Sequence, residues 1–149
     1  MKPFEKILIA IDFSENSDFA FDYALTLAKQ FKAELTVMHV INEPVDLRGF
    51  YVPHISFEEL EKEIEEGATK MMEKFCQAKL DGFTNYKTEI VSGIPYEEII
   101  KKAEETSASL IVLGTHGRTG LDHLIFGSTA ERVVRSASCP VLTIRLAAE

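Results

Sequence analysis

The sequence has few cysteines and no long run of apolar residues. Cys76 and Cys139 are the only two cysteines among 149 residues and lie far apart, so neither a disulfide framework nor a cysteine-rich zinc site is expected. We expect both to be reduced thiols in the core, where free cysteine is commonly found. No apolar stretch approaches the roughly 18 residues that suggest a membrane-spanning helix, and the polar N-terminal residues lack the pattern of a signal peptide. These absences predict a cytoplasmic protein without a membrane partner.

Basic residues are outnumbered by acidic ones. Lys and Arg number 16 against 24 Asp and Glu, which gives a formal net charge of -8. Non-specific binding to nucleic acid or to an anionic membrane needs a basic surface, so neither partner is expected. The length fits a single domain, residues 1–149, that buries roughly two thirds of the surface exposed by its unfolded chain. Because the chain is acidic overall, an anionic ligand would have to be held by a few local groups.

Short apolar runs alternate with helical patterns along the whole chain. The alternation predicts an α/β fold with right-handed crossovers and a parallel sheet that is covered by helices on both faces. With five strands, the doubly wound order 3-2-1-4-5 places the first and fourth strands side by side at the switch point. Two segments alternate in polarity and are expected at the sheet edges, namely Tyr86–Val91 and Val141–Arg145. The other predicted strands are Lys6–Ile11, Glu34–Val40 and Leu110–Leu113.

Two long helices are predicted to bury one face each. On the first helix, residues 14–31, the predicted core face comprises Ala20, Tyr23, Ala24, Leu27, Ala28 and Phe31. On the second, which Ser56 opens and Asp81 and Gly82 end, it comprises Leu60, Ile64, Ala68, Met71, Phe75 and Lys79. The many acids of the second helix are interpreted as a solvated face and not as metal ligands.

A glycine-rich loop follows the buried run Leu110–Leu113. Gly114, Gly117 and Gly120 allow a sharp turn and a close approach of a ligand, because they have no Cβ. Ser128 or its neighbour Gly127 should cap a helix, because the residues that follow recur at helical spacing, namely Ala130, Val133, Val134 and Ala137. Free amides at a helix start favour phosphate. The loop is therefore interpreted as an anion site, with further donors from Thr115, Arg118, Ser128 and Thr129; the alternative is that its glycines serve only the turns.

Asp12 stands at the end of the first predicted strand. Parallel sheets bind ligands outside the carboxyl ends of their strands, so Asp12 is a candidate ligand contact. It could equally cap the turn before the helix that begins near Ser14. His39, at the end of the second strand, is interpreted as structural. The long connection Asn42–Ile55 is either a lid over the ligand or a plain flexible loop.

The spacing of the glycine-rich loop is G-x-x-G, nine residues, then G-S, which is neither the dinucleotide fingerprint nor the P-loop. Gly114, Gly117, Gly127 and Ser128 match the nucleotide motif of the universal stress protein family in its ATP-binding branch. The flanking LIVLGTHGRTG and CPVLTIR are similar to that family, as are KILIAIDFSENS, TVMHVINE and VSGIPYEEII in the same order. The resemblance thus spans the whole chain.

The resemblance implies a Rossmann-like or flavodoxin-like domain that binds ATP, with or without Mg²⁺ or Mn²⁺ on the phosphates. It also implies a homodimer through the last strand, Val141 to Arg145. Val40 is included among the contacts through its backbone and on the resemblance alone. The implied nucleotide contacts are Ala10, Ile11, Asp12, Val40, Leu113, Gly114, Thr115, His116, Gly117, Arg118, Gly127, Ser128 and Thr129.

Three functions agree with this sequence to different degrees. The first is a nucleotide-dependent stress-response or signalling module with at most slow ATP hydrolysis. The second is a genuine ATPase or phosphotransferase, which requires a metal-holding acid and an activated nucleophile. Neither group is evident, and no orienting carboxylate stands beside His116 in the sequence, so no catalytic residue is assigned. The third is a scaffold or a protein for a non-nucleotide ligand, against which the intact glycine motif argues.

Overall fold

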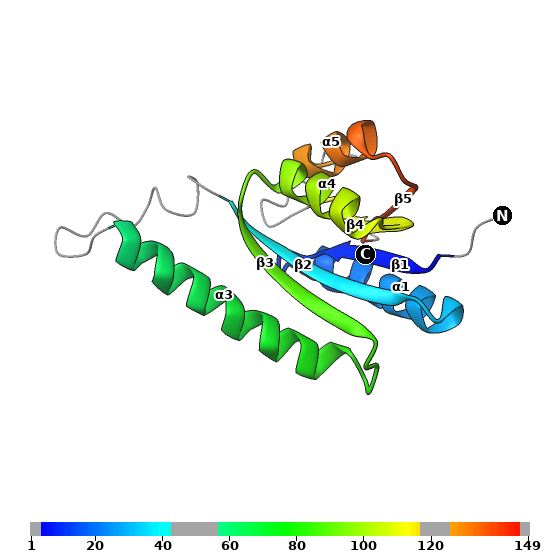
Figure 1. The fold of residues 1–149 in the computed structure, drawn as a ribbon, viewed down its shortest axis with the longest axis horizontal. Coiled ribbons are helices and arrows are strands. Elements are labelled where there is room, and N and C mark those ends of the chain that lie inside the picture. The colour runs from blue at the N-terminus through cyan, green and yellow to red at the C-terminus, as the bar shows by residue number, and fades with distance from the viewer. Residues whose placement is uncertain (1–3, 43–56, 117–125, 147–149) are drawn as a thin grey trace.

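Five parallel strands form one sheet in the order β3-β2-β1-β4-β5 within the described residues (Figure 1). The structure, a computed structural model, describes residues 4–42, 57–116 and 126–146. Every pair of neighbouring strands is parallel, so the predicted fold class and strand order are confirmed. The strands are β1 (Lys6–Ala10), β2 (Glu34–Asn42), β3 (Tyr86–Gly93), β4 (Leu110–Gly114) and β5 (Val141–Ile144).

Helices cover both faces of the sheet. One face carries α1 (Glu15–Phe31) and α3 (Phe57–Lys79), and the other carries α4 (Pro95–Thr106) and α5 (Ser128–Ser136) (Figure 1). Within the described ranges, no helix combines the length and the apolar character that a membrane crossing requires.

The central strands are buried on both faces, which explains their unbroken apolar sequences. Ile7 and Ile9 of β1 belong to the core under α1 and α3. Leu8, between them, belongs to the separate core under α4 and α5. Side chains alternate between the two faces of a strand, so each face needs an apolar residue at every second position.

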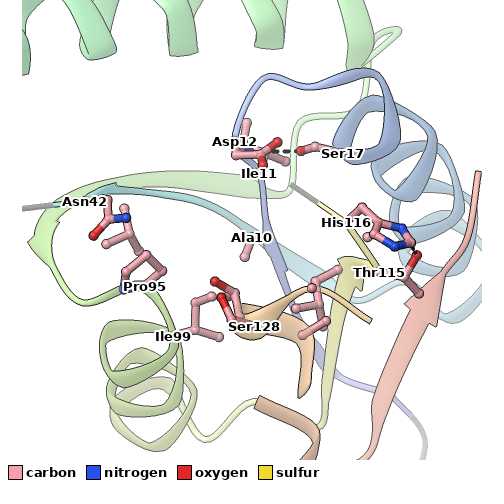
Figure 2. A pocket seen from close by; sticks show the side chains of 16 residues that line it. Ala10, Ile11, Asp12, Ser17, Asn42, Pro95, Ile99, Thr115, His116 and Ser128 are labelled. Atoms are coloured by element: carbon pink, nitrogen blue, oxygen red, sulfur yellow. Dashed lines mark hydrogen bonds between the residues drawn. The ribbon is translucent and has the colours of Figure 1, made fainter. Parts of the chain in front are cut away.

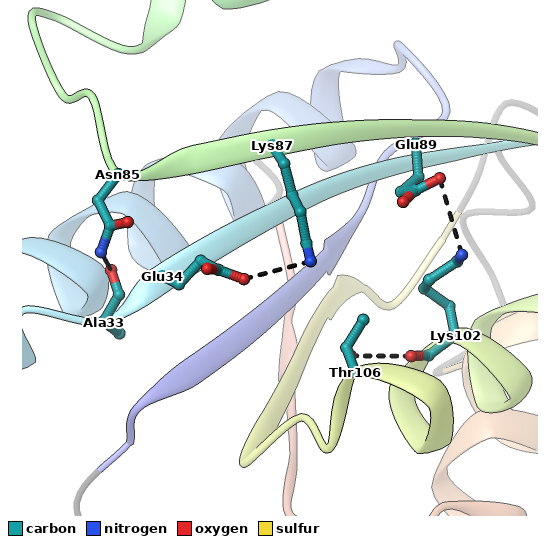
Figure 3. Close-up of polar contacts among 7 residues, drawn as sticks. All are labelled: Ala33, Glu34, Asn85, Lys87, Glu89, Lys102 and Thr106. Atoms are coloured by element: carbon teal, nitrogen blue, oxygen red, sulfur yellow. Dashed lines mark hydrogen bonds and ion pairs between the residues drawn. The ribbon is translucent and has the colours of Figure 1, made fainter.

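The edge strand β3 is partly exposed, as its alternating sequence predicts. Charged side chains of β3 form ion pairs with the neighbouring β2 and α4 (Figure 3). Lys87 Nζ lies 3.4 Å from Glu34 Oε1 of β2, and Lys102 Nζ of α4 lies 3.7 Å from Glu89 Oε2. Charged residues along an edge discourage pairing with another chain.

The predicted core faces of the two long helices were partly wrong. Tyr23 and Phe31 of α1 are exposed, whereas Phe21 is fully buried. On α3, Met71 is 50% exposed and its neighbour Met72 only 2% exposed. Apolar residues on these helices occur at both three- and four-residue steps, and only the contact with the sheet decides which of two neighbours faces inward.

The burial predicted for the C-terminal part of the chain was also partly wrong. Val133 of α5 is fully buried, but Val134, which the helical pattern placed beside it, is exposed. Cys76 is buried, whereas Cys139 is only partly buried. Burial raises the pKa of both thiols, so both are protonated at neutral pH.

Candidate functional site

A pocket of about 410 Å³ opens at the carboxyl ends of β1, β2 and β4. It lies where β1 and β4 are neighbours and the strand order reverses, which is where open α/β sheets bind ligands. Figure 2 shows Asn42 and Pro95 at one end of the pocket and Thr115 and His116 at the other. The volume is within the range of roughly 300–1,000 Å³ that is typical of small-molecule sites.

Every predicted contact within the described residues lines this pocket. The structure therefore brings together segments that are far apart in the sequence. These residues are Ala10, Ile11, Asp12, Val40, Leu113, Gly114, Thr115, His116, Gly127, Ser128 and Thr129. Gly117, Arg118 and Gly120 lie outside the described residues, and so do positions 43–55 of the predicted lid.

Asp12 forms part of the turn between β1 and α1. Its Oδ1 accepts a hydrogen bond from the Ser14 amide at 3.0 Å, and its own amide donates to Ser17 Oγ at 3.0 Å (Figure 2). The hydroxyl of Ser14, the N-cap of α1, accepts from the Ser17 amide at 3.2 Å. The turn-capping interpretation of Asp12 is thus confirmed. Because Asp12 also lines the pocket, that role does not exclude a ligand contact.

The His39 side chain stabilises the backbone of Ile11, a residue that lines the pocket. Its Nδ1 lies 2.8 Å from the carbonyl oxygen of Ile11, and because a carbonyl only accepts, Nδ1 carries the proton. The ring is buried and lies 4.6 Å, centroid to centroid, from the ring of Phe13. The structural role predicted for His39 is confirmed, and it fixes the backbone of a residue that lines the pocket.

The N-terminus of α5 forms the other side of the pocket. Gly127 is the N-cap, and its amide donates to the Thr115 carbonyl at 2.6 Å. The cap is therefore the neighbour of Ser128, and no side chain in the described part of the chain caps this helix. The amides of the first turn, together with the positive end of the helix dipole, favour an anion.

Asn16 is a residue of this region that the sequence did not reveal. Its Oδ1 accepts from the His116 amide at 2.8 Å, and its Nδ2 donates to the Ile144 carbonyl at 3.1 Å. A Cβ on Gly114 would lie only 2.8 Å from Asn16 Oδ1. Gly114 therefore makes room for Asn16, whereas the sequence suggested that it makes room for a ligand. An asparagine in the first turn of a helix gives no sign of partners that are about 100 residues away.

Five further residues of the described ranges line the pocket without having been predicted. Ile99 and Ala130 belong to the inward faces of α4 and α5, where a pocket lining cannot be distinguished from core by periodicity. The others are Ser17, Asn42 and Pro95. The last two extend the pocket toward the end of β2 and the start of α4.

Comparison with known protein families matches residues 3–145 to the universal stress protein family. Universal stress protein YxiE of Bacillus subtilis is 36% identical over 147 residues, which cover 95% of this chain and 99% of the relative. Protein MJ0577, a universal stress protein of Methanocaldococcus jannaschii, has a solved structure with a TM-score of 0.85 and 31% identity, covering 99% of this chain and 100% of its own.

A universal stress protein from Archaeoglobus fulgidus, solved in complex with dAMP, has a TM-score of 0.55 and is 21% identical, covering 96% of this chain and 99% of its own. At that identity the similarity shows the fold.

Proposed function

Because the chain belongs to the universal stress protein family, we propose that its pocket binds ATP and that the protein acts as a nucleotide-dependent stress-response or signalling module. One observation carries the proposal. The ends of β1, β2 and β4 and the N-terminus of α5 contribute those residues implied by the family resemblance that the structure describes, and they line one pocket. A protein of the same fold has been solved with dAMP, so the fold can hold an adenine nucleotide.

Different parts of the pocket lining suit different parts of ATP. Val40, Pro95 and Ile99 contribute apolar side chains, which suit the adenine ring. The phosphates are assigned to Gly114–His116 and Gly127–Thr129, which we call the anion-binding segments. Asp12, in the pocket wall, is assigned to a ribose hydroxyl.

A divalent metal would be held mainly by the phosphates. Among the described residues that line the pocket, Asp12 supplies the only carboxylate. Within the described ranges, no three His, Cys, Asp or Glu side chains are grouped so that they could hold an ion. Mg²⁺ commonly binds through one or two carboxylates and substrate phosphates, so this lining fits a metal that arrives with ATP. Bound there, the metal would neutralise phosphate charge.

The proposal is tested by a charge placed at the start of α5. Ser128 is exposed and is the first residue of that helix, where an aspartate interacts favourably with the helix dipole. Ser128→Asp should therefore fold normally but repel the phosphates, and we expect its Kd for ATP to rise at least about tenfold. Isothermal titration with ATP, AMP and adenosine measures this, with the neutral Ser128→Asn as the matched control.

The same titration distinguishes the alternatives. Wild-type affinity of Ser128→Asp for ATP would contradict the phosphate assignment, because the new carboxylate would stand among the anion-binding segments. Absence of any ATP binding by the wild type would favour the scaffold interpretation. Phosphate release measured over hours separates a binding module, with slow hydrolysis at most, from an ATPase, with many turnovers.

We also propose that the protein forms a homodimer through β5. The Ile144 carbonyl accepts from the Thr115 amide, so by the alternation of the strand the Thr143 amide faces the open edge. Thr143→Pro removes that donor but keeps the ladder between β4 and β5. Sedimentation velocity at micromolar concentration should show a dimer for the wild type and a monomer for the variant. A monomeric wild type would contradict the proposal.

A further inference from the structure

Asn16 joins three segments that are remote in the sequence. It lies in the first turn of α1, and its side-chain amide contacts the main chain after β4 and the end of β5. Its Oδ1 accepts from the His116 amide at 2.8 Å, and its Nδ2 donates to the Ile144 carbonyl at 3.1 Å. A carbonyl only accepts and an amide N–H only donates, so these partners fix the orientation of the Asn16 side chain.

The same main-chain groups hold the anion-binding segments together. The Ile144 carbonyl accepts a second hydrogen bond, from the Thr115 amide at 3.0 Å. The Thr115 carbonyl accepts from the Gly127 amide at 2.6 Å, which links the segment after β4 to the start of α5. Asn16 therefore belongs to the network that sets the distance between the two anion-binding segments.

Asn16 has little freedom to move. The residue is 7% exposed, and it stands against Gly114, where a Cβ would meet its amide at 2.8 Å. It is not among the residues that line the pocket. Any effect of Asn16 on a ligand must therefore pass through the main chain that it holds.

We propose that Asn16 is the positioning residue of the phosphate end of the pocket. Its amide holds the His116 main chain and the end of β5 in the arrangement that receives the phosphates. This inference rests on the proposed ATP binding, because it assigns a role to Asn16 in that same site. It makes Asn16 responsible for the affinity for phosphates and not for the affinity for the nucleoside.

Asn16→Leu tests this inference, because leucine has a similar shape and makes neither hydrogen bond. We expect the Kd for ATP to rise roughly tenfold or more, while the Kd for adenosine changes by less than about twofold. The matched control is Asn85→Leu. Asn85 Nδ2 also donates to a carbonyl, that of Ala33, at 3.3 Å, but at the opposite edge of the sheet (Figure 3). A purely structural asparagine would change the melting temperature and leave the ratio of the two Kd values unchanged.

Asn16→Asp gives a second test that does not depend on the leucine variant folding. A protonated aspartic acid can accept from the His116 amide and donate to the Ile144 carbonyl, whereas the carboxylate cannot donate. The ATP Kd of the variant, divided by that of the wild type at the same pH, should be large at about pH 8 and fall toward one at about pH 5.5, because burial raises the pKa of a carboxyl.

The outcomes are distinct. If the wild type binds ATP and both variants keep the wild-type ratio of ATP to adenosine affinity at every pH, the role of Asn16 is refuted and the proposed function stands. If the wild type binds no ATP, the proposed function fails and this inference fails with it.

Discussion

Replacing Gly114 with alanine should destabilise the protein through one neighbour, the side chain of Asn16. The added Cβ would lie 2.8 Å from Oδ1, 2.9 Å from Cγ and 3.2 Å from Nδ2 of Asn16. Two of these distances are too short for any real contact, so the amide would have to shift. The shift would strain its hydrogen bonds to His116 and Ile144.

The size of the effect follows from these contacts. Overpacking of a buried site costs about 1–3 kcal/mol, and this figure includes the weakened hydrogen bonds. Alanine also restricts the unfolded chain, which offsets about 0.4–1 kcal/mol. We therefore expect Gly114→Ala to lower the free energy of unfolding by about 1–2 kcal/mol. In an Asn16→Ala background, all three crowded atoms are absent and the cost should disappear.

A double-mutant cycle measures this coupling directly. Urea unfolding followed by circular dichroism gives the free energy of unfolding of the wild type, both single variants and the double variant. We expect a coupling energy of at least about 1 kcal/mol. Gly67→Ala is the matched control, because no atom lies within 4 Å of a Cβ built there. It should stabilise α3 by about 0.5–1 kcal/mol with or without Asn16. Equal costs of Gly114→Ala in both backgrounds would refute the reasoning.

Two predictions concern pH. Burial raises the pKa of Asp18 above 3.8, despite the opposing charge of Lys79, so its carboxylate destabilises the fold once it is charged. Asp18→Asn should therefore be more stable than the wild type in urea at pH 7, and the difference should vanish as the pH falls below 3.8. A hydrogen bond to Glu105 and the charge of Glu89 raise the pKa of Lys102 above 10.5, so its stabilisation is complete below that pH and is lost above it. Lys102→Met should cost about 0.5 kcal/mol at neutral pH, and its difference from the wild type should shrink above pH 10.5.

Most of the fold was predictable from local patterns. Strands such as β1 and β4 are recognisable in the sequence as short apolar runs, because both of their faces are buried. The alternation of strands and helices then leaves few possible topologies. What failed was the choice between neighbours, as with Met71 and Met72. Both residues are apolar, and only the packing of the helix against the sheet decides which one is buried.

The site was predictable to the extent that local sequence determines it. Gly127 and Ser128 indicate a helix start in the sequence, although the structure was needed to show that Gly127 is the cap, and Asp12 indicates a strand end. Val40 was included among the predicted contacts on the family resemblance alone. Its predicted contact is made by the backbone, and such a contact does not restrict the choice of side chain.

Asn16 shows where sequence reasoning stops. Its partners are main-chain groups of His116 and Ile144, and a main-chain amide or carbonyl is present at every such position whatever the side chain. The only trace in the sequence is at Gly114, where a missing Cβ leaves room for the asparagine amide. A missing Cβ can leave room for a side chain or for a ligand. The sequence does not show which of the two occupies the room, because that depends on the neighbours that the fold brings together. For this reason the glycine spacing was enough to propose the anion-binding segments, whereas the residue that we propose to hold them in place could be found only in the structure.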